Sequence, residues 1–147
     1  MSILLVSAMI FSFSLTAFAY DTDVVYESAE INMEIDVDGD GEMDGTITDE
    51  TPYLLVVPEK LTVDGATDTV YISGIVDTAV TVTVPSKVEM SDETDNKLTA
   101  DIAMDSGNLV LPISLTDVGN ANAGISATWS EAPLAGSWTG NFAYSVQ

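Results

Sequence analysis

Alternation of apolar and polar residues is the clearest pattern in this chain. From residue 137 to 146, every second position is aromatic, glycine or aliphatic: Trp138, Gly140, Phe142, Tyr144 and Val146. A period of two is that of a half-buried β-strand, so this run predicts a strand with a strong inner face. Gly140 on that face predicts a close approach by another backbone or by a large side chain.

Similar short runs, rich in Val, Ile, Thr and aromatic residues, recur along the chain. They cover residues 53–57, 69–75, 80–84, 98–104, 109–115 and 125–129. Turn signals at 63–65, 105–107 and 135–136 separate some of them, and Pro112 predicts an edge position or a bulge. Helical spacing is nearly absent. Seven to nine short strands without helices predict an all-β protein, an antiparallel β-sandwich with immunoglobulin-like connectivity.

The sandwich is expected to cover residues 53–147, preceded by an acidic N-terminal extension over residues 20–52. Within the extension, apolar residues alternate at Ile31, Met33, Ile35 and Val37. They predict one more strand over Ala29–Val37, with Gly45–Thr48 pairing with it as a hairpin.

The first nineteen residues have the pattern of a signal peptide. An apolar run over residues 3–19 ends in Ala17-Phe18-Ala19, the small-x-small pattern that signal peptidase accepts. We therefore predict cleavage after Ala19 and a secreted, extracellular protein without stable membrane insertion, although Met1-Ser2 lacks the usual basic residue. The alternative is an uncleaved anchor, for which the run is slightly short.

Charge and composition narrow the function classes. The chain has 24 acidic and 3 basic residues, all lysines, for a net charge of -21. Such a surface repels phosphate backbones and anionic lipids, which excludes nucleic-acid binding, and it attracts divalent cations. The alternative reading of the acidity is a solvated, self-repelling surface. Cys and His are both 0, which removes thiolate chemistry and the usual general base, so we expect no enzymatic activity. The alternative to a non-catalytic protein is a small extracellular hydrolase that uses two carboxylates.

The best-defined chemical motif is the acidic loop, residues 36–44. Its candidate metal ligands are Asp36, Asp38, Asp40, Glu42 and Asp44. The D-x-D-x-D-G spacing places three carboxylates on one side of a tight turn, and hard oxygen ligands suit Ca²⁺.

An EF-hand is excluded for this loop, because its twelfth position is Ile47 rather than Glu and no flanking helix is expected. Asp49 or Glu50 would supply the distal carboxylate. The alternative to a calcium site is an acidic hairpin turn, since Asp-Gly also forms hairpins.

The aromatic residues suggest a second kind of site. Trp129 and Trp138 would form a sugar-stacking platform if exposed, but their positions in the alternation favour the core. Tyr71 is the aromatic residue that the pattern places better on the surface.

Three segments together resemble known proteins: Tyr53–Pro58, Val80–Pro85 and Leu134–Phe142. They look like segments of small secreted surface proteins of Gram-positive bacteria, including WxL-like modules. The resemblance covers roughly residues 53–147 and implies an immunoglobulin-like sandwich at the cell surface, with no catalytic residues. The Trp-x-Leu signature of wall-attached members is absent.

The expected function is therefore that of a secreted, non-catalytic structural or adhesive module, stabilised by Ca²⁺ and self-assembling. Its partners would be an envelope protein, a glycan or other copies of itself, with residues 20–37 as a strand donor. The alternative function is an extracellular carbohydrate-binding module.

Overall fold

The structure, a computed structural model, describes residues 2–4 and 31–147. In chain order the strands are β1 (Ser2–Leu4), β2 (Asn32–Ile35), β3 (Gly45–Thr48), β4 (Tyr53–Val57), β5 (Asp68–Val76), β6 (Val80–Thr83), β7 (Lys87–Asp92), β8 (Lys97–Met104), β9 (Leu109–Leu111), β10 (Ser114–Trp129), β11 (Trp138–Thr139) and β12 (Ser145–Val146). Every pairing is antiparallel, and the described part of the chain contains no helix. The predicted all-β, antiparallel class is confirmed.

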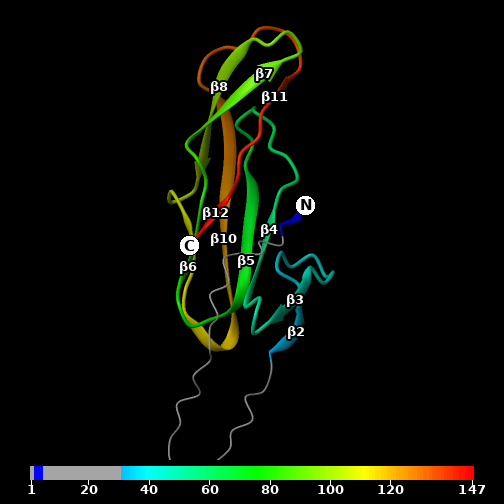
Figure 1. The fold of residues 1–147 in the computed structure, drawn as a ribbon, viewed down its shortest axis with the longest axis vertical. Coiled ribbons are helices and arrows are strands. Elements are labelled where there is room, and N and C mark those ends of the chain that lie inside the picture. The colour runs from blue at the N-terminus through cyan, green and yellow to red at the C-terminus, as the bar shows by residue number, and fades with distance from the viewer. Residues whose placement is uncertain (1, 5–30) are drawn as a thin grey trace, which may run out of the picture.

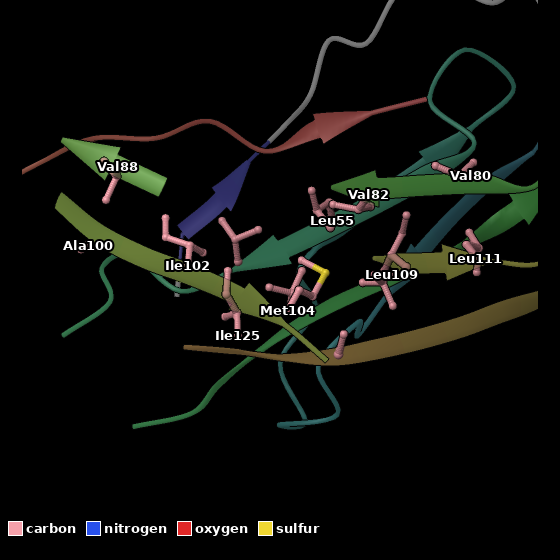
Figure 2. Packing of buried hydrophobic residues seen from close by; sticks show 14 of the residues in the cluster. Leu55, Val80, Val82, Val88, Ala100, Ile102, Met104, Leu109, Leu111 and Ile125 are labelled. Carbon is pink, nitrogen blue, oxygen red and sulfur yellow. The ribbon is translucent and has the colours of Figure 1, made fainter. Parts of the chain in front are cut away.

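Two sheets enclose the main core. The large sheet has the order β1-β4-β5-β10-β8-β7-β11, and the small sheet has the order β12-β6-β9 (Figure 1). Figure 2 shows Val82 and Leu109 of the small sheet in one cluster with Leu55 and Met104 of the large sheet. This layering is consistent with a β-sandwich.

The alternation in sequence explains which side chains enter the core. In β6, Val80 and Val82 are buried, whereas the intervening threonines are half-buried. In β8, Ala100, Ile102 and Met104 face the same core. Burying such side chains contributes about 1.5–3 kcal/mol each for the larger ones, so the apolar parity determines which face of each strand turns inward.

The β2–β3 hairpin packs on the outer face of the large sheet and confirms the predicted pairing of these two segments. Its residues Ile35, Val37 and Ile47 form a second cluster with Leu54 and Val56 of β4. The other parity of β4 enters the main core. This explains why β4 is apolar throughout: its side chains are covered on both faces.

The last predicted strand is divided between the two sheets. β11 pairs with β7 in the large sheet, and β12 pairs with β6 in the small sheet. Trp138, Phe142, Tyr144 and Val146 on the predicted inner face are nevertheless half-buried, whereas Gly140 is exposed. A Cβ on Gly140 would lie 2.6 Å from both the Glu89 carbonyl oxygen and the Met90 Sδ, which confirms the close approach predicted there.

Three segments differ from the sequence prediction. The predicted strand over residues 109–115 is shorter, because β9 ends at Leu111, and Ile113 and Leu115 are exposed. β7 was not predicted, although Val88 and Met90 alternate into its core face. β10 begins at Ser114, sixteen residues long, rather than at Ile125. A bulge interrupts its pairing with β5 between Ser114 and Gly119. Pro112 lies between β9 and β10, and β9 is an edge strand of the small sheet.

The predicted signal peptide falls largely outside the described residues, which begin again at Ile31. Its residues Ser2–Leu4 form β1, which lies on the free side of β4 at the N-terminal end of the ribbon (Figure 1). Cleavage after Ala19 therefore stays a prediction. Among the described residues, no helix has the length and apolar character needed to cross a membrane.

Candidate metal centre

The acidic loop connects β2 to β3 at the turn of the hairpin. The buried Ile35 and Val37 anchor its first arm in the second cluster, and Ile47 anchors the second arm. Gly39 and Gly41 have φ angles of 77° and 93°. Other residues rarely adopt this left-handed conformation, so the two glycines permit the sharp turn that the sequence predicts.

Three of the five predicted ligands come together in this loop. One carboxylate oxygen from each of Asp36, Asp38 and Asp40 lies within 4.8 Å of the other two. Oxygens bound to one Ca²⁺ ion at 2.3–2.6 Å are separated by at most about 5 Å, so this spacing is compatible with a shared ion. Asp36 and Asp38 are half-buried and Asp40 is exposed.

Backbone amides hold these carboxylates in place. Asp36 accepts hydrogen bonds from the amides of Gly39 at 2.7 Å and Gly41 at 2.9 Å, one on each oxygen. Asp38 and Asp40 each accept one such bond on Oδ1, from the amides two residues further along. The same loop geometry also stabilises an acidic turn without any ion.

The loop concentrates negative charge around Asp38. Desolvation raises the pKa of the Asp38 carboxyl above its usual value, and the negative charges of Asp44, Asp40 and Asp36 raise it further. The ionised form of Asp38 therefore costs stability at neutral pH. Either a proton or a bound cation would relieve this repulsion.

The other two predicted ligands, Glu42 and Asp44, lie in the same loop but are not part of the converging group. Asp44 Oδ2 accepts the Val37 amide at 2.6 Å and the Asp38 amide at 3.3 Å, so it closes the loop. Asp49 accepts the Ile31 amide at 3.3 Å, at the opposite end of the hairpin from the acidic loop. The expectation that Asp49 completes the ligand set is therefore wrong.

The two tryptophans contact each other and pack against the main core. Trp129 and Trp138 meet edge to face, with ring centroids 5.9 Å apart and planes at 74°, and both pack against the main core. The indole N–H of Trp138 donates to the Leu134 carbonyl oxygen at 3.0 Å. Both side chains are half-buried, and this packing against the main core favours the core interpretation over an exposed stacking platform. Tyr71 is half-buried beneath the β2–β3 hairpin, so the expectation of a surface aromatic there is wrong.

Two hollows lie away from the acidic loop. A cavity of about 30 Å³ between the hairpin and the sheet is lined by Asp49, Ile75 and Leu115, among others, and it has room for a single water. A shallow polar groove runs along β10, where Asp105 and Asn122 line it. The sequence did not predict this groove, because residues 116–124 were not assigned to any strand, whereas the structure places them in β10.

Comparisons of the chain with protein-family models, with curated proteins and with solved structures found no match.

Proposed function

We propose that this protein is an exported, non-catalytic structural module of the cell surface, stabilised by Ca²⁺ at the acidic loop. The observation that carries the proposal is the convergence of Asp36, Asp38 and Asp40 within 4.8 Å on a hairpin packed against the sheet. Extracellular modules bind Ca²⁺ with dissociation constants of about 0.1–1 mM, which suits a small set of carboxylates.

The composition supports a structural role. With no His, no Cys and no Arg, the chain lacks the usual general base, a thiolate nucleophile and a bidentate anion clamp. Without disulfides, an exported protein depends on core packing and on bound ions. The likeness of residues 53–147 to secreted surface proteins supports the same conclusion.

The proposal includes immunoglobulin-like connectivity for the sandwich. It is supported by the order of β4, β5, β10 and β8 in one sheet and by the pairing of β6 with β12 and β9 in the other. Folds of this kind commonly present loops and edges to partners while the core stays closed.

Calcium is expected to stabilise the exported protein measurably. At 10 mM, a ligand with these affinities contributes about 1.4–2.7 kcal/mol, which corresponds to a rise in Tm of roughly 5–10 °C. The rise should shrink as the pH falls from 7 towards 4, because protons compete for Asp38, whose pKa is raised. Thermal unfolding followed by circular dichroism, with Ca²⁺ and with EDTA, measures both effects.

Two matched variants distinguish a site from general charge screening. Asp38→Asn should raise Tm without Ca²⁺, because it removes the repulsion, and should abolish the gain from Ca²⁺. Glu131→Gln removes the same charge from an exposed loop and should leave that gain unchanged. An equal response of both variants, or no shift at 10 mM Ca²⁺, would contradict the calcium site.

Export is tested by expressing the full chain in a Gram-positive host. The mass of the protein recovered from the medium is then measured by mass spectrometry. We expect a mass that begins at Tyr20, since cleavage should follow Ala19. A protein that stays in the cell, or that keeps Met1, would overturn the assignment to the cell surface.

A further inference from the structure

The edge of the large sheet is covered by a segment that the proposed processing removes. β1 pairs antiparallel with β4, with Ser2 opposite Val57, Ile3 opposite Val56 and Leu4 opposite Leu55. Residues 2–4 belong to the predicted signal peptide. Cleavage after Ala19 would therefore turn β4 into the edge strand.

The hydrogen-bonding groups that this would expose follow from the register. The Ile75 amide donates to the Pro52 carbonyl oxygen at 2.9 Å, so Pro52 and Ile75 form a hydrogen-bonded pair. Along an antiparallel ladder, hydrogen-bonded and non-hydrogen-bonded residue pairs alternate. Leu54 and Val56 therefore bond to β5, whereas the backbone groups of Leu55 and Val57 point away from it, towards β1. Removing β1 leaves these groups without strand partners among residues 31–147.

β4 also lacks the features that normally protect an edge. Tyr53-Leu54-Leu55-Val56-Val57 contains no charge, no proline and no bulge. Leu54 to Val57 are between 1% and 4% exposed, because they are packed in the two clusters. A flat apolar edge of high β propensity is a template for pairing with another chain.

We propose that, after removal of the leader, β4 is the docking edge for a second copy of this chain, which pairs through its own β4. The two strands run antiparallel about a twofold axis at Leu55, as a symmetric edge-to-edge pair requires. The inference rests on the export step of the proposed function, and it names a partner and a surface for the self-assembly expected there.

The match between β1 and β4 identifies the second copy as the occupant. Read in the same direction, Ser2-Ile3-Leu4 aligns with Tyr53-Leu54-Leu55 of the partner's strand. In the twofold pair, Leu54 of the second copy takes the place of Ile3 opposite Val56. Leu55 of the second copy takes the place of Leu4 opposite Leu55. The structure already pairs this edge with an apolar strand in the orientation that the twofold pair needs.

The same register brings opposite charges together. Just outside the two ends of β4, the twofold axis brings Glu50 of one copy towards Lys60 of the other, and both residues are exposed. The remaining surface is strongly negative, since each chain carries a net charge of -21. Dimerisation should therefore strengthen as NaCl rises from about 10 mM to about 500 mM, because salt screens the long-range repulsion.

Sedimentation velocity over a range of protein concentrations tests the inference on two forms of the full chain. The form exported and processed by a secreting host should be a dimer. The form expressed inside the cell keeps residues 1–19 and should be a monomer, because β1 covers the edge. A processed protein that is monomeric at every salt concentration would overturn the inference alone, whereas a recovered protein that keeps Met1 overturns the export step and the inference together.

Edge variants of the processed form test the surface itself. Val57→Pro removes an outward-facing N–H and no bond to β5, so it should weaken dimerisation about tenfold through loss of two symmetric hydrogen bonds. Val57→Ala keeps this N–H and should remain a dimer. Circular dichroism establishes that both variants are folded, and a dimer that survives Val57→Pro unchanged would place the contact elsewhere.

A charge pair provides a second comparison. Lys60→Glu should weaken the dimer more than Lys97→Glu, although both substitutions change the net charge equally. Lys97 lies 3.1 Å from Glu89 in the β7–β8 hairpin, away from β4. Equal effects of the two substitutions would contradict the twofold register.

Discussion

Gly74→Ala is expected to destabilise the protein by about 3 kcal/mol or more, a large part of the usual 5–15 kcal/mol. A Cβ at this position would lie 2.3 Å from the Pro52 carbonyl oxygen and 2.6 Å from the Tyr53 Cα. Both are backbone atoms, so β4 would have to move away from β5. The movement would also strain the bond from the Ile75 amide to Pro52. Urea unfolding at pH 7 measures the loss.

Gly119→Ala is the matched control for this prediction. Gly119 is the cross-strand partner of Gly74 in β10. A Cβ there would meet the side chains of Ser114 at 3.3 Å and Leu111 at 3.4 Å, and it would lie at an ordinary contact distance of 3.6 Å from the Gly74 carbonyl oxygen. These side chains can shift by a few tenths of an ångström, so the cost should stay below about 1 kcal/mol. Similar losses in both variants would show that glycine matters here for its chain flexibility rather than for the approach of β4.

The strands that the sequence predicted well are those with one face turned towards the core and the other towards solvent. β6 alternates Val and Thr over its whole length, and β8 alternates similarly around Ile102 and Met104. In such segments the hydrophobic period alone determines the strand and its inward face. The strand β2 was predicted for the same reason, from the alternation of Ile31, Met33, Ile35 and Val37, of which Ile35 and Val37 are buried and Met33 is exposed.

β10 shows why other segments could not be predicted. Its part before Ile125 contains Gly119, Asn120, Asn122 and Gly124, residue types that favour turns in isolation. In the folded protein, the side chains of neighbouring segments occupy this space: a Cβ on Gly124 would meet the carboxylate of Asp105. The small residues are therefore required by long-range packing, which local pattern does not encode.

The acidic loop was predicted only in part for a similar reason. The spacing of Asp36, Asp38 and Asp40 fixes their convergence, because a tight turn brings alternate side chains to one side. Spacing does not reveal which backbone amides compete for a carboxylate. Asp44 is bound by two such amides. Similarly, Asp49 follows β3 directly, but the antiparallel pairing carries it to the far end of the hairpin.

Ile47→Ala is expected to detach the β2–β3 hairpin from the sheet. Ile47 has no exposed surface and belongs to the second cluster, together with Ile35 and with Leu54 and Val56 of β4. Truncating a buried isoleucine costs about 2–5 kcal/mol, and here the loss falls on the contact between hairpin and sheet. Hydrogen exchange should therefore accelerate in β2 and β3, whereas the amides of β5 and β10, inside the main sheet, should keep most of their protection.

Met33→Ala provides the control within the same hairpin. Met33 is the cross-strand partner of Ile47, but 44% of its surface is exposed, so its truncation should cost much less. If the calcium proposal holds, 10 mM Ca²⁺ should restore part of the hairpin protection in Ile47→Ala, because an ion held by Asp36, Asp38 and Asp40 stabilises the turn that joins the two strands. Uniform acceleration across β2, β3, β5 and β10 would instead mean that hairpin and sandwich unfold as one cooperative unit, and the second cluster would then be part of the global core.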